Sequence, residues 1–208
     1  MRPNYQDLGL SVGKQVIASD LAGGDTNDVF TPQDAIPSQM QSRIQLLEHG
    51  GNLQLNKTTN GWQQGMWVHY RPRHATFGVA RPGQKWAASG PFSGCHLSIG
   101  QKDGKMYIAH IAKESGSNAE AQWNAKTGDW DEWARMKIGA YAPVGLDINT
   151  HKANASIVFV DWFAGEDPDS LQITRVEFES SLTGGFTAGA MRISKVASLP
   201  MAKCVEWS

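Results

Sequence analysis

The sequence predicts a strand-rich α+β fold with a few flanking helices, formed as one domain over residues 1–208 with mixed or antiparallel, sandwich-like sheets. Three observations support this class. Short apolar segments recur from residue 65 onward, separated by turn-forming Gly, Pro and Asp residues. Only two parts of the chain have helical character. The length of 208 residues, 40% of them hydrophobic, suits one domain with a buried core.

The first part of the chain contributes little predicted structure. Residues 1–30 are rich in polar residues and glycine, and we expect a loosely ordered N-terminal segment with one short strand at residues 16–18. Residues 39–49 are predicted to form a helix, because their apolar residues repeat at helical spacing and a Gly-Gly pair follows.

The rest of the chain is dominated by segments with the pattern of strands. The predicted strands are 66–70, 76–80, 95–99, 106–111, 155–163, 171–178 and 185–196. Asp103-Gly104 separates two of these segments, and Asp-Gly between apolar segments is a strong hairpin signal. Residues 118–124 and 131–137 carry helix formers and are predicted as a second helical region. Asp129, Asp131 and Glu132 are then expected at a solvated helix N-terminus.

Charge and hydrophobicity exclude several classes of partner. The chain has 19 basic and 20 acidic residues, a formal net charge of -1 and no run of five like charges. We therefore expect neither a nucleic acid nor a membrane as partner. No apolar run approaches the roughly 18 residues of a membrane span. Residues 1–10 lack a signal-peptide pattern, so we expect a cytoplasmic protein unless a route other than Sec exports it. We also expect a monomer.

The cysteine and histidine content indicates no cofactor and no metal. Two cysteines, Cys95 and Cys204, are too few for a disulfide framework, and no Cys/His spacing matches a zinc site. His69 and His74 flank a short basic loop, where a metal or phosphate site is one interpretation and an exposed polar loop is the favoured one. We expect Cys204 to be structural.

Ser93-Gly94-Cys95 is the first part of a candidate active site. Gly94 removes a side chain beside the sulfur and lets a backbone N–H approach a developing oxyanion, so Ser93 and Gly94 are expected to supply backbone support. A cysteine beside a strand is otherwise a small core residue.

The predicted hairpin brings a histidine to this cysteine. If Asp103-Gly104 forms a two-residue turn, Leu97 faces His110, and Cys95 is a diagonal neighbour on the same face of the sheet. A four-residue turn would place Cys95 directly opposite His110. In both registers His110 can act as the base for the thiol, whose pKa a histidine partner lowers. We therefore expect Cys95 to react faster than Cys204.

Ser89 completes the candidate site as the residue that orients the histidine. It lies six residues before Cys95, beyond Gly90-Pro91, which is predicted to turn the chain. Its hydroxyl is expected to accept a hydrogen bond from the His110 ring and so to fix the tautomer. A backbone carbonyl would serve equally well.

These residues resemble a known family of toxins. The order Ser93-Gly94-Cys95, strand, turn, strand and a histidine fifteen residues after the cysteine is similar to the catalytic core of the cytotoxic necrotizing factors and Burkholderia lethal factor. It resembles the chemotaxis receptor glutamine deamidases more remotely. Ser89 stands where some members carry Thr. The tryptophan-bearing region that follows His110 is also similar in order, so the resemblance covers residues 86–135.

The resemblance implies a cysteine-dependent glutamine deamidase, secreted by a bacterium and acting in the host cytosol. Cys95 would attack the carboxamide of a glutamine in a host protein, His110 would move the proton, and water would release glutamate from the thioester. An amine in place of water would give transglutamination. Relatives act on Rho-type GTPases, on a translation initiation helicase or on chemoreceptors, so the partner is expected to be such a protein.

Two other functions are compatible with the sequence. The first is another Cys–His hydrolase, although a spacing of fifteen residues is far shorter than that of papain-like enzymes. The second is a non-catalytic, β-rich binding module that uses Trp62, Trp130 or Trp133 as a ligand platform.

Overall fold

The computed structural model describes residues 15–17, 37–49, 52–58, 65–113, 115–139, 154–179 and 191–201. Over these ranges the chain forms thirteen strands in two mixed sheets, one α-helix and two short 3-10 helices, η2 (Thr127–Asp129) and η3 (Pro168–Ser170). The coarse prediction of a strand-rich chain with few helices is therefore confirmed. Apart from the strand at residues 15–17, the prediction for residues 1–30 lies outside the described residues.

The first sheet closes on itself, and we call it the closed sheet. In spatial order its strands are β1 (Gln15–Ile17), β13 (Met191–Pro200), β12 (Gln172–Glu179), β11 (Asn154–Asp161), β7 (Trp86–Phe92), β5 (Gly65–His69), β3 (Gln41–His49) and β4 (Asn52–Lys57). Two of its pairs, β5 with β7 and β1 with β4, are parallel, and the others are antiparallel.

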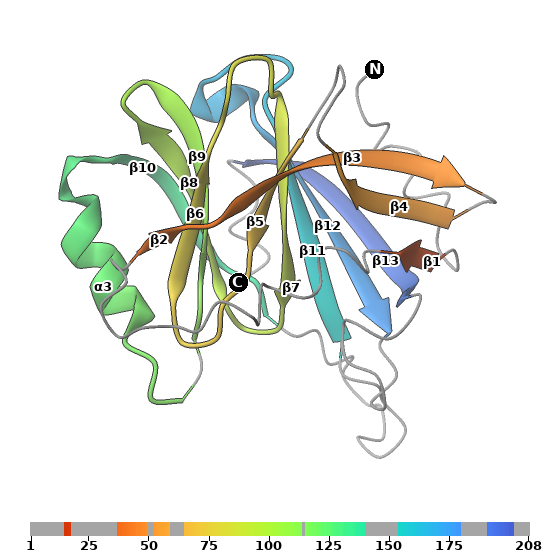
Figure 1. Cartoon of the computed structure of the whole chain (residues 1–208), viewed down its shortest axis with the longest axis horizontal. Coiled ribbons are helices and arrows are strands. Elements are labelled where there is room, and N and C mark those ends of the chain that lie inside the picture. The colour runs from red at the N-terminus through yellow and green to blue at the C-terminus, as the bar shows by residue number, and fades with distance from the viewer. Residues whose placement is uncertain are drawn as a thin grey trace.

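The second sheet has five strands and carries the helix. Its order is β10 (Asp131–Lys137), β8 (His96–Lys102), β9 (Lys105–Ile111), β6 (Ala75–Val79) and β2 (Ser38–Gln39). Helix α3 (Ala119–Lys126) lies beside this sheet (Figure 1). Its buried Trp123 contacts the rings of Phe77 and Tyr107 on β6 and β9, so aromatic packing holds the helix on the outer face.

The β8–β9 hairpin has the predicted two-residue turn. Asp103 and Gly104 have φ angles of 51° and 68°, and positive φ at both central residues is the signature of a type I′ turn. Lys102 pairs with Lys105, and six further pairs follow without a shift, including Leu97 with His110. The turn therefore fixes the register on which the candidate site depends.

Residues 39–49 are not a helix, and this prediction was wrong. Residues Gln41–His49 form β3, which pairs with β4 on one side and β5 on the other. Ile44 is fully buried, while Arg43 beside it is exposed, which is the alternation of a strand. Two flanking strands satisfy the backbone of this segment, and that tertiary pairing overrides a short helical pattern.

The second helical region is only half helical. Residues Ala119–Lys126 form α3 as expected, but Asp131–Lys137 is strand β10, paired with β8. Asp131 and Glu132 are consequently not at a helix N-terminus. The helix-forming composition of this segment yields to pairing along an open sheet edge.

Strand β7 was not predicted, although it carries Ser89. Gly90-Pro91, predicted as a turn, lies inside this strand. Its pairing with β11 shifts between Ser156 and Val158, so the strand accommodates the proline at an irregularity rather than ending there. The other predicted strands agree with the structure to within a few residues at their ends. For the last of them, β13 is Met191–Pro200, and the predicted part at residues 185–190 lies outside the described residues.

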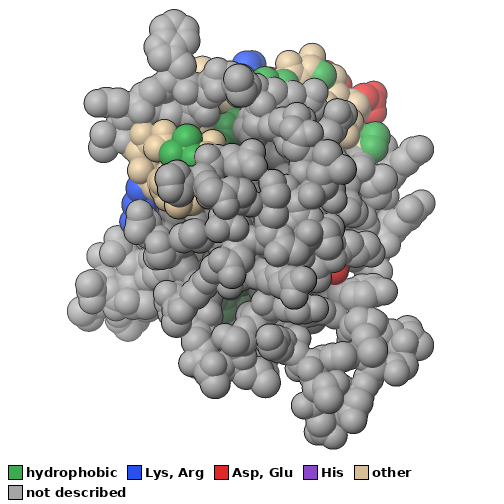
Figure 2. Space-filling view, turned by 90° about the vertical axis from the view of Figure 1, so that its right-hand side faces the viewer, with side chains coloured by type: hydrophobic (Ala, Val, Ile, Leu, Met, Phe, Trp, Pro, Cys, Tyr) green, Lys and Arg blue, Asp and Glu red, His purple; other side chains and the backbone are tan. Residues whose placement is uncertain are grey.

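One buried apolar cluster combines side chains from both sheets, among them Val68, Leu97, Ile99, Ile108 and Val158. None of the helices in the described part of the chain has the length and apolarity needed to cross a lipid bilayer. On the face in Figure 2, the described side chains appear in small mixed groups, without a broad patch of one kind.

Candidate functional site

His110 lies where the two sheets meet. It projects from β9 of the five-stranded sheet and is 1% exposed. Its Nδ1 lies 3.0 Å from the hydroxyl of Ser89, which is buried on β7 of the closed sheet. The predicted contact between Ser89 and His110 is therefore present and joins the two sheets.

The hydrogen bonds of Ser89 define the tautomer of His110. The Ser89 hydroxyl donates its single proton to the carbonyl oxygen of Val68, at 2.8 Å. Its oxygen can then only accept from the ring, so Nδ1 carries the proton and Nε2 carries a lone pair. Nε2 is buried and has no hydrogen-bond partner among the residues that the structure describes.

Two aromatic rings surround the imidazole. Phe92 stacks on it with centroids 4.0 Å apart and an angle of 8°, and Tyr70 is tilted against it at 4.9 Å. Burial lowers the pKa of His110 to about 3, because a charged ring cannot be hydrated there. The imidazole is thus neutral at physiological pH and holds its lone pair at Nε2.

The irregularity in β7 explains how one strand supplies two of these contacts. Ser89 and Phe92 are three residues apart, and a regular strand would send their side chains to opposite faces. Ser156 pairs with Phe92 and Val158 with Ser89, so two residues of β11 span three of β7. Both side chains therefore face His110.

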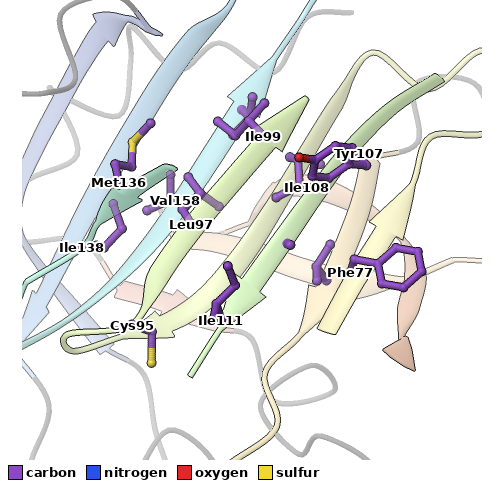
Figure 3. Packing of buried hydrophobic residues seen from close by; sticks show 14 of the residues in the cluster. Phe77, Cys95, Leu97, Ile99, Tyr107, Ile108, Ile111, Met136, Ile138 and Val158 are labelled. Carbon is purple, nitrogen blue, oxygen red and sulfur yellow. The ribbon is translucent and has the colours of Figure 1, made fainter. Parts of the chain in front are cut away.

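Cys95 lies between β7 and β8, at the end of the hairpin. Its carbonyl accepts from Ile138 at 2.9 Å, and the Gly94 N–H donates to the Ile138 carbonyl at 2.8 Å. The thiol is 7% exposed. Figure 3 shows its sulfur at one end of the apolar cluster, pointing away from the labelled aliphatic side chains.

The relation between Cys95 and His110 depends on the strand register. Leu97 pairs with His110. Cys95 precedes Leu97 by two residues but lies just before β8, which begins at His96, so the alternation of strand side chains does not by itself assign its face. That Cys95 and His110 share a face stays a prediction. No hydrogen bond joins the two side chains, because Nε2 of His110 has no partner within the described residues.

The expected lowering of the thiol pKa is wrong for this structure. Burial raises the pKa of Cys95, and the backbone amides of Lys113 and Ser93 offset this only in part. Because the neighbouring imidazole is neutral, it supplies no positive charge to favour the thiolate. Cys95 is therefore a protonated thiol at neutral pH. Cys204 lies outside the described residues.

The two residues expected to support an oxyanion differ. Gly94 has a φ of 119°, a conformation that favours glycine. The space where a side chain would be is open. Its N–H is already bonded to Ile138 and is not available as a donor. The backbone amide of Ser93 instead acts on the Cys95 sulfur, as does that of Lys113.

Two cavities among the described residues lie away from this site. Two hollows, of about 490 Å³ and 140 Å³, are lined by residues of β3, β4, the β6–β7 connection and the start of β9. Neither includes Cys95 or His110. No group of three or more His, Cys, Asp or Glu side chains that could hold a metal occurs over the described ranges.

Other residues considered in the sequence have structural partners. His69 Nε2 lies 2.7 Å from the Ser42 hydroxyl, and His74 Nδ1 donates to the Pro72 carbonyl. Trp130 packs edge-on against Phe77, Tyr107 and Trp123. The Trp133 indole donates to Asp131. Trp62 lies outside the described residues.

A charged network on the opposite face of the five-stranded sheet was missed. Glu132 accepts from Arg135 at 3.0 and 2.7 Å, from Trp123 at 3.4 Å and from Ser98. Burial opposes its ionisation, but hydrogen bonds from Arg135 and Ser98 outweigh this and hold the pKa of Glu132 below its usual value. Residues 131–137 were predicted to be helical, with Glu132 at a solvated helix N-terminus, and this hid the network.

Comparisons with known protein families and with curated proteins find no match to this chain.

Proposed function

We propose that this chain is a cysteine-dependent glutamine deamidase with Cys95 as nucleophile, His110 as base and Ser89 as the residue that orients His110. The proposal includes a sandwich-like fold and a secreted effector that modifies a host protein. The observation that supports it best is the state of His110. A neutral imidazole with its proton at Nδ1, and with no partner for Nε2 among the described residues, has the tautomer that a general base requires.

The reaction begins with the protonated thiol. As the Cys95 sulfur attacks the side-chain carbon of the glutamine, Nε2 of His110 takes the thiol proton and the carbonyl oxygen becomes an oxyanion. The amides of Ser93 and Lys113 favour negative charge on the Cys95 sulfur. Ser89 keeps the proton on Nδ1 throughout, through the hydrogen bond of 3.0 Å.

The second half of the reaction returns the proton. The imidazolium gives its proton to the departing nitrogen, so ammonia leaves and a thioester joins Cys95 to the substrate. His110 then takes a proton from water, whose oxygen attacks the thioester. Glutamate and the thiol are the products, and atoms and charge balance at each step.

The site must open for this chemistry. Cys95 is 7% and His110 1% exposed, so the target protein has to displace groups that cover Nε2. Hydration of His110 on opening would also raise its pKa from about 3 toward its ordinary value, which makes it a stronger base. Binding of the correct target would thereby activate the pair.

The test is a search for glutamine-to-glutamate conversion. Host-cell extract is incubated with the full chain or with Cys95→Ser, and peptides are compared by mass spectrometry for the gain of about one mass unit that deamidation produces at a glutamine. We expect sites that convert only with the wild-type chain. Conversion of no glutamine above the Cys95→Ser background contradicts the proposal.

Burial of both side chains favours a second candidate, a non-catalytic binding module in which His110 only joins the sheets. The deamidase forms a thioester on Cys95, whereas a binding module forms none. Trapping with a glutamine-containing target and hydroxylamine yields a hydroxamate from a thioester, and no hydroxamate from a binding module. Peptide-bond cleavage would instead indicate another Cys–His hydrolase.

A further inference from the structure

The larger cavity lies between two strands of the closed sheet and the connection from β6 to β7. It measures about 490 Å³, and its described lining is Gln41, Ser42, Arg43, Lys57, Thr58 and Arg81. A volume of this size is in the range of small-molecule sites. None of these residues belongs to the proposed deamidase site.

The charges around this cavity are of one sign. Three of the six described lining residues, Arg43, Lys57 and Arg81, are cationic, and none is acidic. The described residues provide no ion pair to any of the three, whereas Lys85 in the smaller hollow pairs with Glu166 at 2.8 Å. Three cations gathered around one hollow create a positive potential that attracts an anion.

The backbone that carries these cations is held in place. The Gln41 amide bonds twice to the backbone of Val79, accepting at 2.7 Å and donating at 3.0 Å. Thr58 donates to the Arg43 carbonyl at 3.0 Å, and the Arg81 N–H donates to the Gln84 side chain at 2.8 Å. The exposed cationic side chains are thus attached to a backbone that hydrogen bonds hold in place. This lowers the entropy that is lost when a ligand binds.

We propose that this cavity binds a small ligand that carries two or more phosphoryl groups. Arg43 and Arg81 offer planar forks that match phosphate oxygens, and Lys57 adds a point charge. A phosphoryl group carries up to about two negative charges, whereas a carboxylate carries one. Two phosphoryl groups can therefore neutralise the three cations, for which three carboxylates would be needed. The cations among the described lining residues are therefore proposed to recognise the phosphoryl groups.

Calorimetric titration of the full chain with inorganic pyrophosphate tests this proposal. At about 0.15 M ionic strength, where exposed charges are largely screened, we expect one pyrophosphate per chain. Citrate, which carries three carboxylates, and inorganic phosphate should each bind more weakly. Citrate binding as tight as pyrophosphate would overturn the assignment to phosphoryl groups, and absence of pyrophosphate binding would overturn the site.

Variants locate the binding. Arg43→Ala and Arg81→Ala should each weaken pyrophosphate about tenfold or more, because each removes charge-assisted hydrogen bonds. Lys126→Ala, which removes one exposed cation from α3, should have no effect. Equal weakening in all three variants would indicate net charge alone and contradict the site. Circular dichroism checks the fold, and Arg43→Lys should bind with intermediate affinity, since it keeps the charge but loses the fork.

Discussion

The two faces of the five-stranded sheet carry polar groups in opposite states. On the face toward the closed sheet, His110 is neutral, stacked on Phe92, and leaves Nε2 without a described partner. On the face toward α3, Glu132 is ionised, and its carboxylate accepts from Arg135, Trp123 and Ser98. His110 is buried, and Glu132 is partly buried.

The difference indicates which face is built for stability and which for chemistry. A charged group under the helix has many donors, as a structural network requires. Burial of an imidazole nitrogen that has no hydrogen-bond partner among the described residues lowers the stability of the fold. Destabilising arrangements of this kind are concentrated at functional sites. Four experiments test this contrast.

Replacement of the nucleophile has the largest expected effect. Cys95→Ser should reduce deamidation by about a thousandfold or more, because a hydroxyl beside a neutral imidazole is a far poorer nucleophile. Stability should change little, since Ser is nearly isosteric. Conversion of the target glutamine is followed by mass spectrometry and folding by thermal melting. Undiminished conversion by folded Cys95→Ser would end the assignment.

Acid should destabilise the His110 face first. The folded pKa is about 3 against an ordinary value of 6.5, so the folded state binds fewer protons than the unfolded state between these values. Stability is complete above pH 6.5 and falls as pH drops toward 3, by about 4 kcal/mol. Urea titrations at several pH values measure this.

The matched variant is His110→Gln, which does not titrate. The stability of this variant should lack the contribution that protonation of His110 makes between pH 6.5 and 3. A plot of its free energy of unfolding against pH should therefore have a shallower slope than that of the wild type. The contribution of Glu132 to stability is lost at lower pH than that of His110. A carboxyl whose pKa is lowered in the folded state loses its stabilising contribution only below its ordinary pKa of 4.5. Identical slopes for wild type and His110→Gln would show that His110 is hydrated.

Glu132→Ala should destabilise the chain by about 2 kcal/mol. The change leaves the half-buried Arg135 and the donors of Ser98 and Trp123 without their acceptor. Asp131→Ala is the control on the same strand, where an exposed side chain bonds Trp133, and should cost about 0.5 kcal/mol or less. Chemical denaturation of both variants gives the comparison. Loss of deamidase activity in folded Glu132→Ala would contradict the division between faces.

The smallest effect is expected at Ser89. Ser89→Ala should lower kcat about tenfold, because Nδ1 loses the acceptor that fixes the tautomer. Ser89→Thr keeps the hydroxyl and should retain most activity. The readout is kcat against KM for the three proteins. A change confined to KM, or none at all, would assign Ser89 to a structural role.

The sequence determined the local part of the site. Asp103-Gly104 favours a type I′ turn because these residues tolerate positive φ, and the register that follows from this turn places His110 opposite Leu97. The contact of Ser89 with His110 was also predicted, although through a turn at Gly90-Pro91 that is in fact part of β7.

Only the tertiary structure decided the rest. Pairing with distant strands made β3 and β10 extended where local composition favours helices. The stacking of Phe92 on His110 depends on an irregularity between β7 and β11. Burial sets the protonation of Cys95 and His110, and burial is the sum of contacts from segments far apart in the chain. A turn needs only its own residues, whereas desolvation needs the whole fold.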